Sequence, residues 1–173
     1  MENIYDILKI SVPAILVMFT AWISIRSMIK NDQDKRKQEL LLQNSKTITP
    51  IRLQAYERII LFLERISLES LLVRVSTPDM TAVQLHSALL TTIRAEFEHN
   101  LSQQIYMTPQ SWEVVRNARS NTIKLINTEM EKMPPNSPGM AFSKRLLERI
   151  MEIEKEPTRV AIEFVKAEIA RIM

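Results

Sequence analysis

The chain has 173 residues, a formal net charge of +3, a single glycine, eight prolines and no cysteine. Without cysteine, the chain cannot build a disulfide framework, a thiolate metal site or a cysteine nucleophile. The single glycine excludes a phosphate-binding loop and a dinucleotide fingerprint, because each needs several glycines. The rest of the composition is rich in residues that favour helices, and it predicts an all-α fold.

The first element is the uncharged run at residues 10–25, ISVPAILVMFTAWISI. Sixteen helical residues cover about 24 Å, which is less than a hydrocarbon core of roughly 30 Å. The helix therefore has to use its flanks, and we expect a transmembrane anchor over residues 1–29. Long or amphipathic side chains are expected at its two membrane borders: Lys9, Trp22, Arg26 and Lys30.

The basic residues around this run predict its orientation. Lys9 is the one basic residue before the run, whereas five follow it by residue 37. This asymmetry predicts that the amino terminus lies outside and the carboxyl-terminal part lies in the cytoplasm. A cleaved signal peptide is the competing interpretation, but it needs a basic start, and this start carries Glu2 and Asp6. A lipid bilayer is thus the first expected partner.

Residues 30–48 are mostly good helix formers and are expected to form a juxtamembrane stalk. We expect the helix to end near Asn44 and Ser45. The three leucines at 40–42 need cover from the domain, from a second copy or from a partner.

Prolines divide the remaining chain, residues 49–173, into helices. Proline suits the first turn of a helix, and a preceding threonine or serine supplies a capping oxygen. Four such pairs and one further proline mark helix starts: Thr49-Pro50, Thr77-Pro78, Thr108-Pro109, Ser137-Pro138 and Pro157. We therefore expect a cytoplasmic bundle of about five helices, at residues 50–66, 79–105, 109–132, 139–154 and 157–172. A short extra turn at 67–73 is expected to be capped by Ser67.

Apolar stripes at helical spacing support this bundle. The second expected helix carries Leu89, Ile93, Phe97, Leu101 and Ile105. The third carries Trp112, Val115, Ala118, Thr122 and Ile126, and the last carries Ala161, Val165, Ile169 and Ile172. Such stripes bury against one another, and the short connections favour antiparallel packing.

The position of the positive charge argues against a nucleic-acid partner. Residues 47–173 contain 16 basic and 15 acidic residues, interleaved along the helices, whereas residues 26–46 contain six basic and three acidic ones. The basic excess therefore lies beside the expected anchor, where an anionic leaflet attracts it. No pattern in the sequence identifies a small-molecule substrate or a cofactor.

One pattern could hold a metal. Glu96 and His99 have the Glu-x-x-His spacing that helical di-iron bundles use twice, but here it occurs once, because Val83 stands three residues before His86. A carboxylate on a facing helix, Glu57 or Glu64, could complete a single-metal site. The competing interpretation gives Glu96 and His99 structural hydrogen bonds on the surface or at a helix end.

Two stretches and the apolar run carry a resemblance to a known family. The stretches are TPIRLQAYERIILFLERI at 49–66 and EFEHNLSQQIYMTPQSW at 96–112. They resemble a family of uncharacterised single-pass membrane proteins of Bacteroidota, and the similarity runs to about residue 130. The resemblance implies an inner-membrane location, a cytoplasmic helical domain and no assigned activity. It also points to a set of candidate residues: Gln54, Tyr56, Glu57, Arg58, Glu96, His99, Asn100, Gln103, Gln104 and Trp112.

These residues are polar groups beside apolar stripes, so they either form a hydrogen-bonded network between helices or a surface that binds a partner. With no catalytic motif, we expect a non-enzymatic accessory or scaffold subunit that docks a helical domain onto a larger inner-membrane complex or self-associates. The alternative is a helical-bundle metal-binding protein or metalloenzyme centred on Glu96 and His99.

Overall fold

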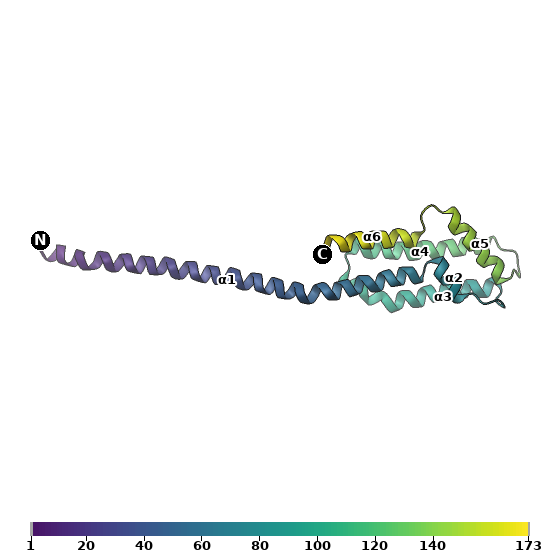
Figure 1. Cartoon of the computed structure of the whole chain (residues 1–173), viewed down its shortest axis with the longest axis horizontal. Helices are drawn as coiled ribbons and strands as arrows, with labels where there is room; N and C mark the ends of the chain where they lie inside the picture. Colours follow the sequence, from purple (N-terminus) through teal and green to yellow (C-terminus); the bar gives the residue numbers. More distant parts are fainter. Residues whose placement is uncertain (1, 173) are drawn as a thin grey trace. The chain divides into compact units, whose positions relative to one another are not determined.

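The computed structural model describes the backbone of residues 2–172, and their side chains except at 2–15, 34, 38, 40, 41, 44, 45 and 172. Over this range the protein is all-helical and contains no strand, which confirms the all-α part of the expected fold. The elements are α1 (Glu2–Arg65), α2 (Leu68–Val75), α3 (Ala82–Asn100), the 3₁₀ helix η1 (Leu101–Tyr106), α4 (Pro109–Glu131), α5 (Gly139–Glu152) and α6 (Pro157–Ile172). The chain divides into two compact units, residues 1–49 and residues 50–173 (Figure 1).

The first unit consists of the amino-terminal part of α1. All side chains of residues 16–33 are exposed, including large apolar ones from Leu16 to Ile29. Among the described residues, no helix combines the length and the apolar character needed to span a membrane. The first part of the predicted span, residues 10–15, and its border residue Lys9 lie outside the described side chains.

Two predictions about this helix were wrong. The stalk does not end near Asn44 and Ser45, and no helix starts at Pro50, because α1 continues to Arg65. Proline removes one backbone donor and costs stability inside a helix. The neighbours Thr47, Ile48 and Thr49 are weak helix formers, so local propensity does not explain why the helix continues through Pro50. Pro50 coincides with the boundary between the two units.

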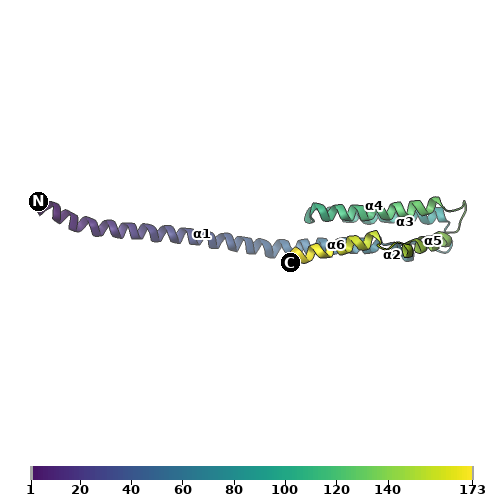
Figure 2. The ribbon, with the colours of Figure 1, turned by 90° about the horizontal axis from the view of Figure 1, so that it is seen from above.

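The second unit is built around four helices: the end of α1, α3, α4 and α6. Figures 1 and 2, taken together, place them at four corners, with α4 beside α3 and α6, and α1 diagonally opposite α4. Short helices α2 and α5 lie at the end of the bundle, where they contact each other and α3. The core contains Ile59, Phe62, Leu63, Leu85, Leu89, Ile93, Val115, Ile126, Phe142 and Val165, all fully buried or nearly so.

Helix starts depend on capping, and here the sequence predictions had mixed success. The start at Pro109 is confirmed, since the Thr108 hydroxyl accepts a 3.1 Å hydrogen bond from the Ser111 N–H. The start at Pro157 is also confirmed. The predicted start after Thr77-Pro78 was wrong, because residues 77–80 form a turn and Thr81 caps α3. Thr81 and Gln84 form a reciprocal capping box, which satisfies two backbone donors at once.

Short α2 lies where the extra turn was expected, and Ser67 is its first flanking residue. The Ser67 hydroxyl does not cap α2. It bonds instead to the Glu64 carbonyl, at 2.8 Å. Likewise, Ser137 does not cap α5, and its hydroxyl bonds the Pro134 carbonyl at 2.7 Å.

The predicted apolar stripe of the second helix is not buried at its carboxyl-terminal end. Leu89 and Ile93 are fully buried, but Ile105 is 76% exposed. The reason is the change from α3 to η1, because a 3₁₀ helix has three residues per turn and rotates a four-residue repeat off the core. By contrast, the α4 stripe is buried from Val115 to Ile126, as predicted.

The single glycine closes the bundle end. Gly139 donates a 2.7 Å hydrogen bond to the Met80 carbonyl, and Ala82 donates one of 2.9 Å to Ser137, which forms an isolated bridge between Thr81 and Pro138. A Cβ on Gly139 would lie 2.7 Å from the Met80 oxygen. Only glycine therefore permits this close approach of the two backbones.

Candidate functional site: a cleft between the first and last helices of the bundle

The centre of the site is a hydrogen bond between two helices that are far apart in the sequence. The Tyr56 hydroxyl, on α1, donates to the Glu168 Oε1 atom, on α6, at 2.8 Å. Tyr56 is only 2% exposed. Burial raises the pKa of Tyr56 above its ordinary value, and the bond to Glu168 and the negative charge of that carboxylate raise it further. Arg52 and the Thr108 backbone oppose this shift. The phenol thus stays protonated and holds Glu168 in one position.

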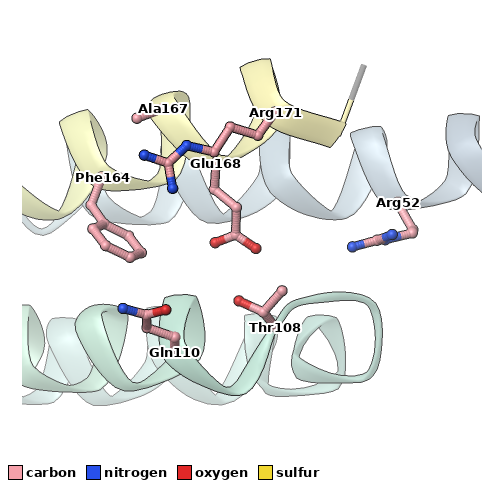
Figure 3. A pocket seen from close by; sticks show the side chains of 7 residues that line it. All are labelled: Arg52, Thr108, Gln110, Phe164, Ala167, Glu168 and Arg171. Carbon is pink, nitrogen blue, oxygen red and sulfur yellow. The ribbon is translucent and has the colours of Figure 1, made fainter.

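Figure 3 shows how neighbouring helices complete the site. Arg52 extends from α1 into the space between α6 and α4, and Thr108 and Gln110 rise from the start of α4. The Arg52 Nε atom donates to the Tyr106 carbonyl at 3.2 Å, which holds the guanidinium at this place. In this view the Arg171 guanidinium lies on the other side of Glu168 from Arg52.

Together these residues line a cleft of about 350 Å³. Its walls carry two guanidinium groups, one carboxylate and one amide, from Arg52, Arg171, Glu168 and Gln110. Phe164 and Ala167 add an apolar surface on α6. Among the described residues, Arg171 makes no ion pair or hydrogen bond. The cleft therefore carries a formal charge of +1, with an available cation beside an apolar wall, which suits binding of an anionic group.

A second polar cluster joins α4 to α5. Glu129 is 3% exposed, and its carboxylate accepts hydrogen bonds from Lys132 at 2.7 Å and from Arg145 at 2.8 Å. Arg149 lies 3.8 Å from the same carboxylate. Burial alone would raise the pKa of Glu129, but the bonds from Lys132 and Arg145 outweigh it and lower that pKa. The charges of this cluster satisfy one another, so it connects two helices.

The candidate metal residues have other partners or lie on the surface. The Glu96 carboxylate lies 2.8 Å from Arg65 on α1 and 3.3 Å from Arg74 on α2. His99 is exposed. The part of the chain that the structure describes contains no group of three or more possible metal-binding side chains. Glu96 thus connects three helices through ion pairs.

The other candidate residues do not gather at one place. Gln54, Glu57 and Arg58 are exposed on α1. Asn100 is buried and donates to the Glu96 carbonyl at 2.8 Å, at the end of α3. The remaining ones lie around η1 and the start of α4: Gln103 is half-buried, Gln104 is exposed, and Trp112 is half-buried and stacks on Phe97 with ring centroids 5.5 Å apart.

The predicted membrane-border residues that are described lie on an exposed helix. Trp22 is 53% exposed, and the Arg26 guanidinium lies 4.7 Å from its ring centroid, in a cation–π contact. Lys30 is exposed. Of the three stalk leucines, Leu42 is exposed, and the side chains of the other two lie outside the described set.

The sequence pattern predicted Tyr56 as a candidate residue but did not predict its partner Glu168 or the buried Glu129. A usable signal exists for Glu129, because it continues the buried series Val115, Ala118, Thr122 and Ile126 with a spacing of three. An acid at a stripe position needs cationic partners. Glu168 similarly follows Val165 by three residues, on the face that packs against the bundle. Arg52 and Arg171 offer no such signal, since only the fold brings them together.

Comparison with known proteins identifies the family. The model of a family of unknown function, DUF7935, matches residues 2–172. The chain belongs to this family. The DUF7935 match includes α5 and α6, so the helices that contribute Glu168 and Arg145 belong to the family domain. No curated protein and no solved structure matches the chain.

Proposed function

We propose that this DUF7935 protein is a non-enzymatic accessory or scaffold subunit of a bacterial inner membrane. In this proposal the amino-terminal part of α1 is a single-pass anchor, and the helical bundle on the cytoplasmic side docks onto a larger membrane complex or onto a second copy. The proposal agrees with the resemblance to single-pass membrane proteins of Bacteroidota.

The observation that carries the proposal is the apolar surface of α1. Leu16, Val17, Met18 and Phe19 are each at least 57% exposed. Four consecutive residues point around the whole circumference of a helix, so this segment is apolar on every side. A helix that is apolar all round needs a non-aqueous environment, and a lipid bilayer supplies one on all sides.

The segment that follows supports the same proposal. Arg26, Lys30, Lys35, Arg36 and Lys37 are all exposed. Asp32 pairs with Arg36 at 3.3 Å, which leaves most of the positive charge available to lipid headgroups. A basic segment directly after an apolar helix favours the cytoplasmic leaflet.

The bundle supports a binding role. Its polar clusters, at Glu96 and Glu129, consist of paired charges that connect helices. The cleft at Tyr56 supplies guanidinium groups and an apolar wall, which are elements of recognition. The bundle as a whole carries nearly equal numbers of acidic and basic residues, which agrees with a protein partner more than with a nucleic acid.

Affinity purification from mildly crosslinked membranes tests the proposal. We expect the full chain in the membrane fraction, together with a defined partner or a second copy. The double variant Leu16→Lys, Ile23→Lys should leave the membrane, because each lysine costs about 3 kcal/mol at the centre of a span. The control Gln33→Lys, in the polar segment, should stay. Recovery of the native chain from the soluble fraction, or from membranes only as a monomer, would contradict the proposal.

A further inference from the structure

We propose that the cleft between α1, α4 and α6 is the docking site for an acidic segment of a partner protein. This inference rests on the proposed scaffold function and names the surface and the kind of partner. The segment places carboxylates against Arg171 and Arg52, and a large apolar side chain against Phe164 and Ala167.

The cleft contains an unpaired cation. Arg171 has no ion pair or hydrogen bond among the described residues, whereas the carboxylates of Glu96 and Glu129 each have cationic partners. Arg52 uses its Nε atom for the Tyr106 carbonyl and also hydrogen-bonds the Tyr56 side chain, but no described carboxylate forms an ion pair with it. Guanidinium groups bind carboxylates through two parallel hydrogen bonds, so both arginines can accept an acidic side chain.

The Tyr56 hydroxyl fixes the position of Glu168 in the cleft. The Glu168 carboxylate lies between the two arginines in Figure 3. The buried Tyr56 hydroxyl holds Oε1 at 2.8 Å, and this bond keeps the carboxylate oriented toward α1. The cleft therefore keeps a positive charge and a fixed shape before a ligand arrives, which lowers the entropic cost of binding.

The apolar wall of the cleft favours a protein segment among possible anions. Phe164 is half-buried and Ala167 exposed, so the cleft presents an apolar wall next to its cations. An acidic peptide can contact both, whereas a small inorganic anion uses only the arginines. A nucleic acid is disfavoured, because the bundle carries nearly as many acidic as basic residues.

Binding of short peptides to the full chain in uncharged-detergent micelles tests the proposal. The probe is a capped peptide with two glutamates flanking leucine and phenylalanine. The control peptide has glutamines in their place. We expect the acidic peptide to shift the Nε–Hε nuclear magnetic resonance signals of Arg52 and Arg171, with an affinity at least about tenfold above that of the control peptide.

Matched variants place the binding site. Arg171→Glu should weaken binding of the acidic peptide by about tenfold, because it inverts a charge that no described contact uses. Arg159→Glu, an exposed arginine on the same helix, should change the affinity less than about twofold. Circular dichroism of both variants confirms that the bundle is intact.

Three results would overturn the inference: no shift with the acidic peptide, equal binding of the glutamine peptide, or equal shifts and affinity with inorganic phosphate. The last result would identify a simple anion site. Each is independent of the membrane anchor, because the peptide test needs only the folded chain. If crosslinking recovers a partner while the peptide test fails, the scaffold function stands and this docking site is rejected.

Discussion

At the scale of single residues, two carboxyl groups, the half-buried Glu168 and the buried Glu129, connect helices by different means. Glu168 accepts a bond from a neutral phenol, whereas Glu129 is bonded by two cations, Lys132 and Arg145. A neutral phenol does not compensate the cations of the cleft, whereas Lys132 and Arg145 compensate the charge of Glu129. The first cluster therefore suits binding of a charged group, and the second connects α4 to α5.

The lowered pKa of Glu129 predicts sensitivity to acid. A carboxyl group whose pKa is lower in the folded state contributes stability above its unfolded pKa and loses it as the pH falls through the folded value. We expect Glu129→Gln to lower the free energy of unfolding by about 1–3 kcal/mol at neutral pH. The loss should shrink as the solution becomes acidic.

Urea unfolding followed by circular dichroism at several pH values measures this effect. The matched control is Glu131→Gln, an exposed glutamate on the same helix, which should stay within about 0.5 kcal/mol of the native chain. A constant difference between native chain and Glu129→Gln at every pH would show that the charge of Glu129 contributes nothing.

At the scale of elements, the sequence predicted helices better than their ends. Thr108-Pro109 was a reliable start because both the cap and the proline act in one place. Thr77-Pro78 had the same form, but α3 starts after Thr81 instead. The Gln84 side chain accepts a hydrogen bond from the Thr81 backbone, which adds a second bond to the cap. The Thr-x-x-Gln pattern was present in the sequence, so this start could have been predicted. The change to η1 and the passage of α1 through Pro50 depend on tertiary context, which local patterns do not contain.

The contact at Gly139 gives a prediction for the junction of α3 and α5. Gly139→Ala places a methyl group against the Met80 carbonyl, so one backbone has to move. We expect the free energy of unfolding to fall by about 1–3 kcal/mol, which is typical of overpacking. Thermal unfolding measures it, with Met140→Ala as control, because that neighbour is 63% exposed. Equal stability of Gly139→Ala and the native chain would mean that this close approach is not required.

At the scale of the whole chain, composition predicted more than any motif. The scarcity of glycine and the spacing of apolar residues were sufficient to predict an all-α chain with a helical bundle, and the structure confirms helices over residues 2–172 and the bundle from residue 50 onward. The cleft could not be predicted, because Arg52, Thr108 and Glu168 lie in separate parts of the sequence. A hydrophobic pattern indicates which residues are inside, but it does not indicate which helices are neighbours.

The absence of cysteine makes the proposed membrane topology directly testable. A single thiol at Ser120→Cys, an exposed position on α4, should react with a membrane-impermeant maleimide in inverted vesicles and remain unlabelled in intact spheroplasts. Asn3→Cys should show the reverse. The native chain serves as the unlabelled control. Labelling of Ser120→Cys in intact spheroplasts would place the bundle outside and reject the orientation.

The bond between Tyr56 and Glu168 joins residues 112 positions apart, and this separation governs when the cleft forms. A ribosome makes α1 with Arg52 first and α6 last, so in the proposed topology the nascent chain would reach the membrane long before its cleft exists. A chain truncated before α6 would keep the amino-terminal part of α1, which is the proposed anchor. It would lack Glu168 and the wall of the cleft that α6 supplies. Under the proposed scaffold function, only a completely synthesised chain would present the docking site, so unfinished subunits would stay out of the assembly.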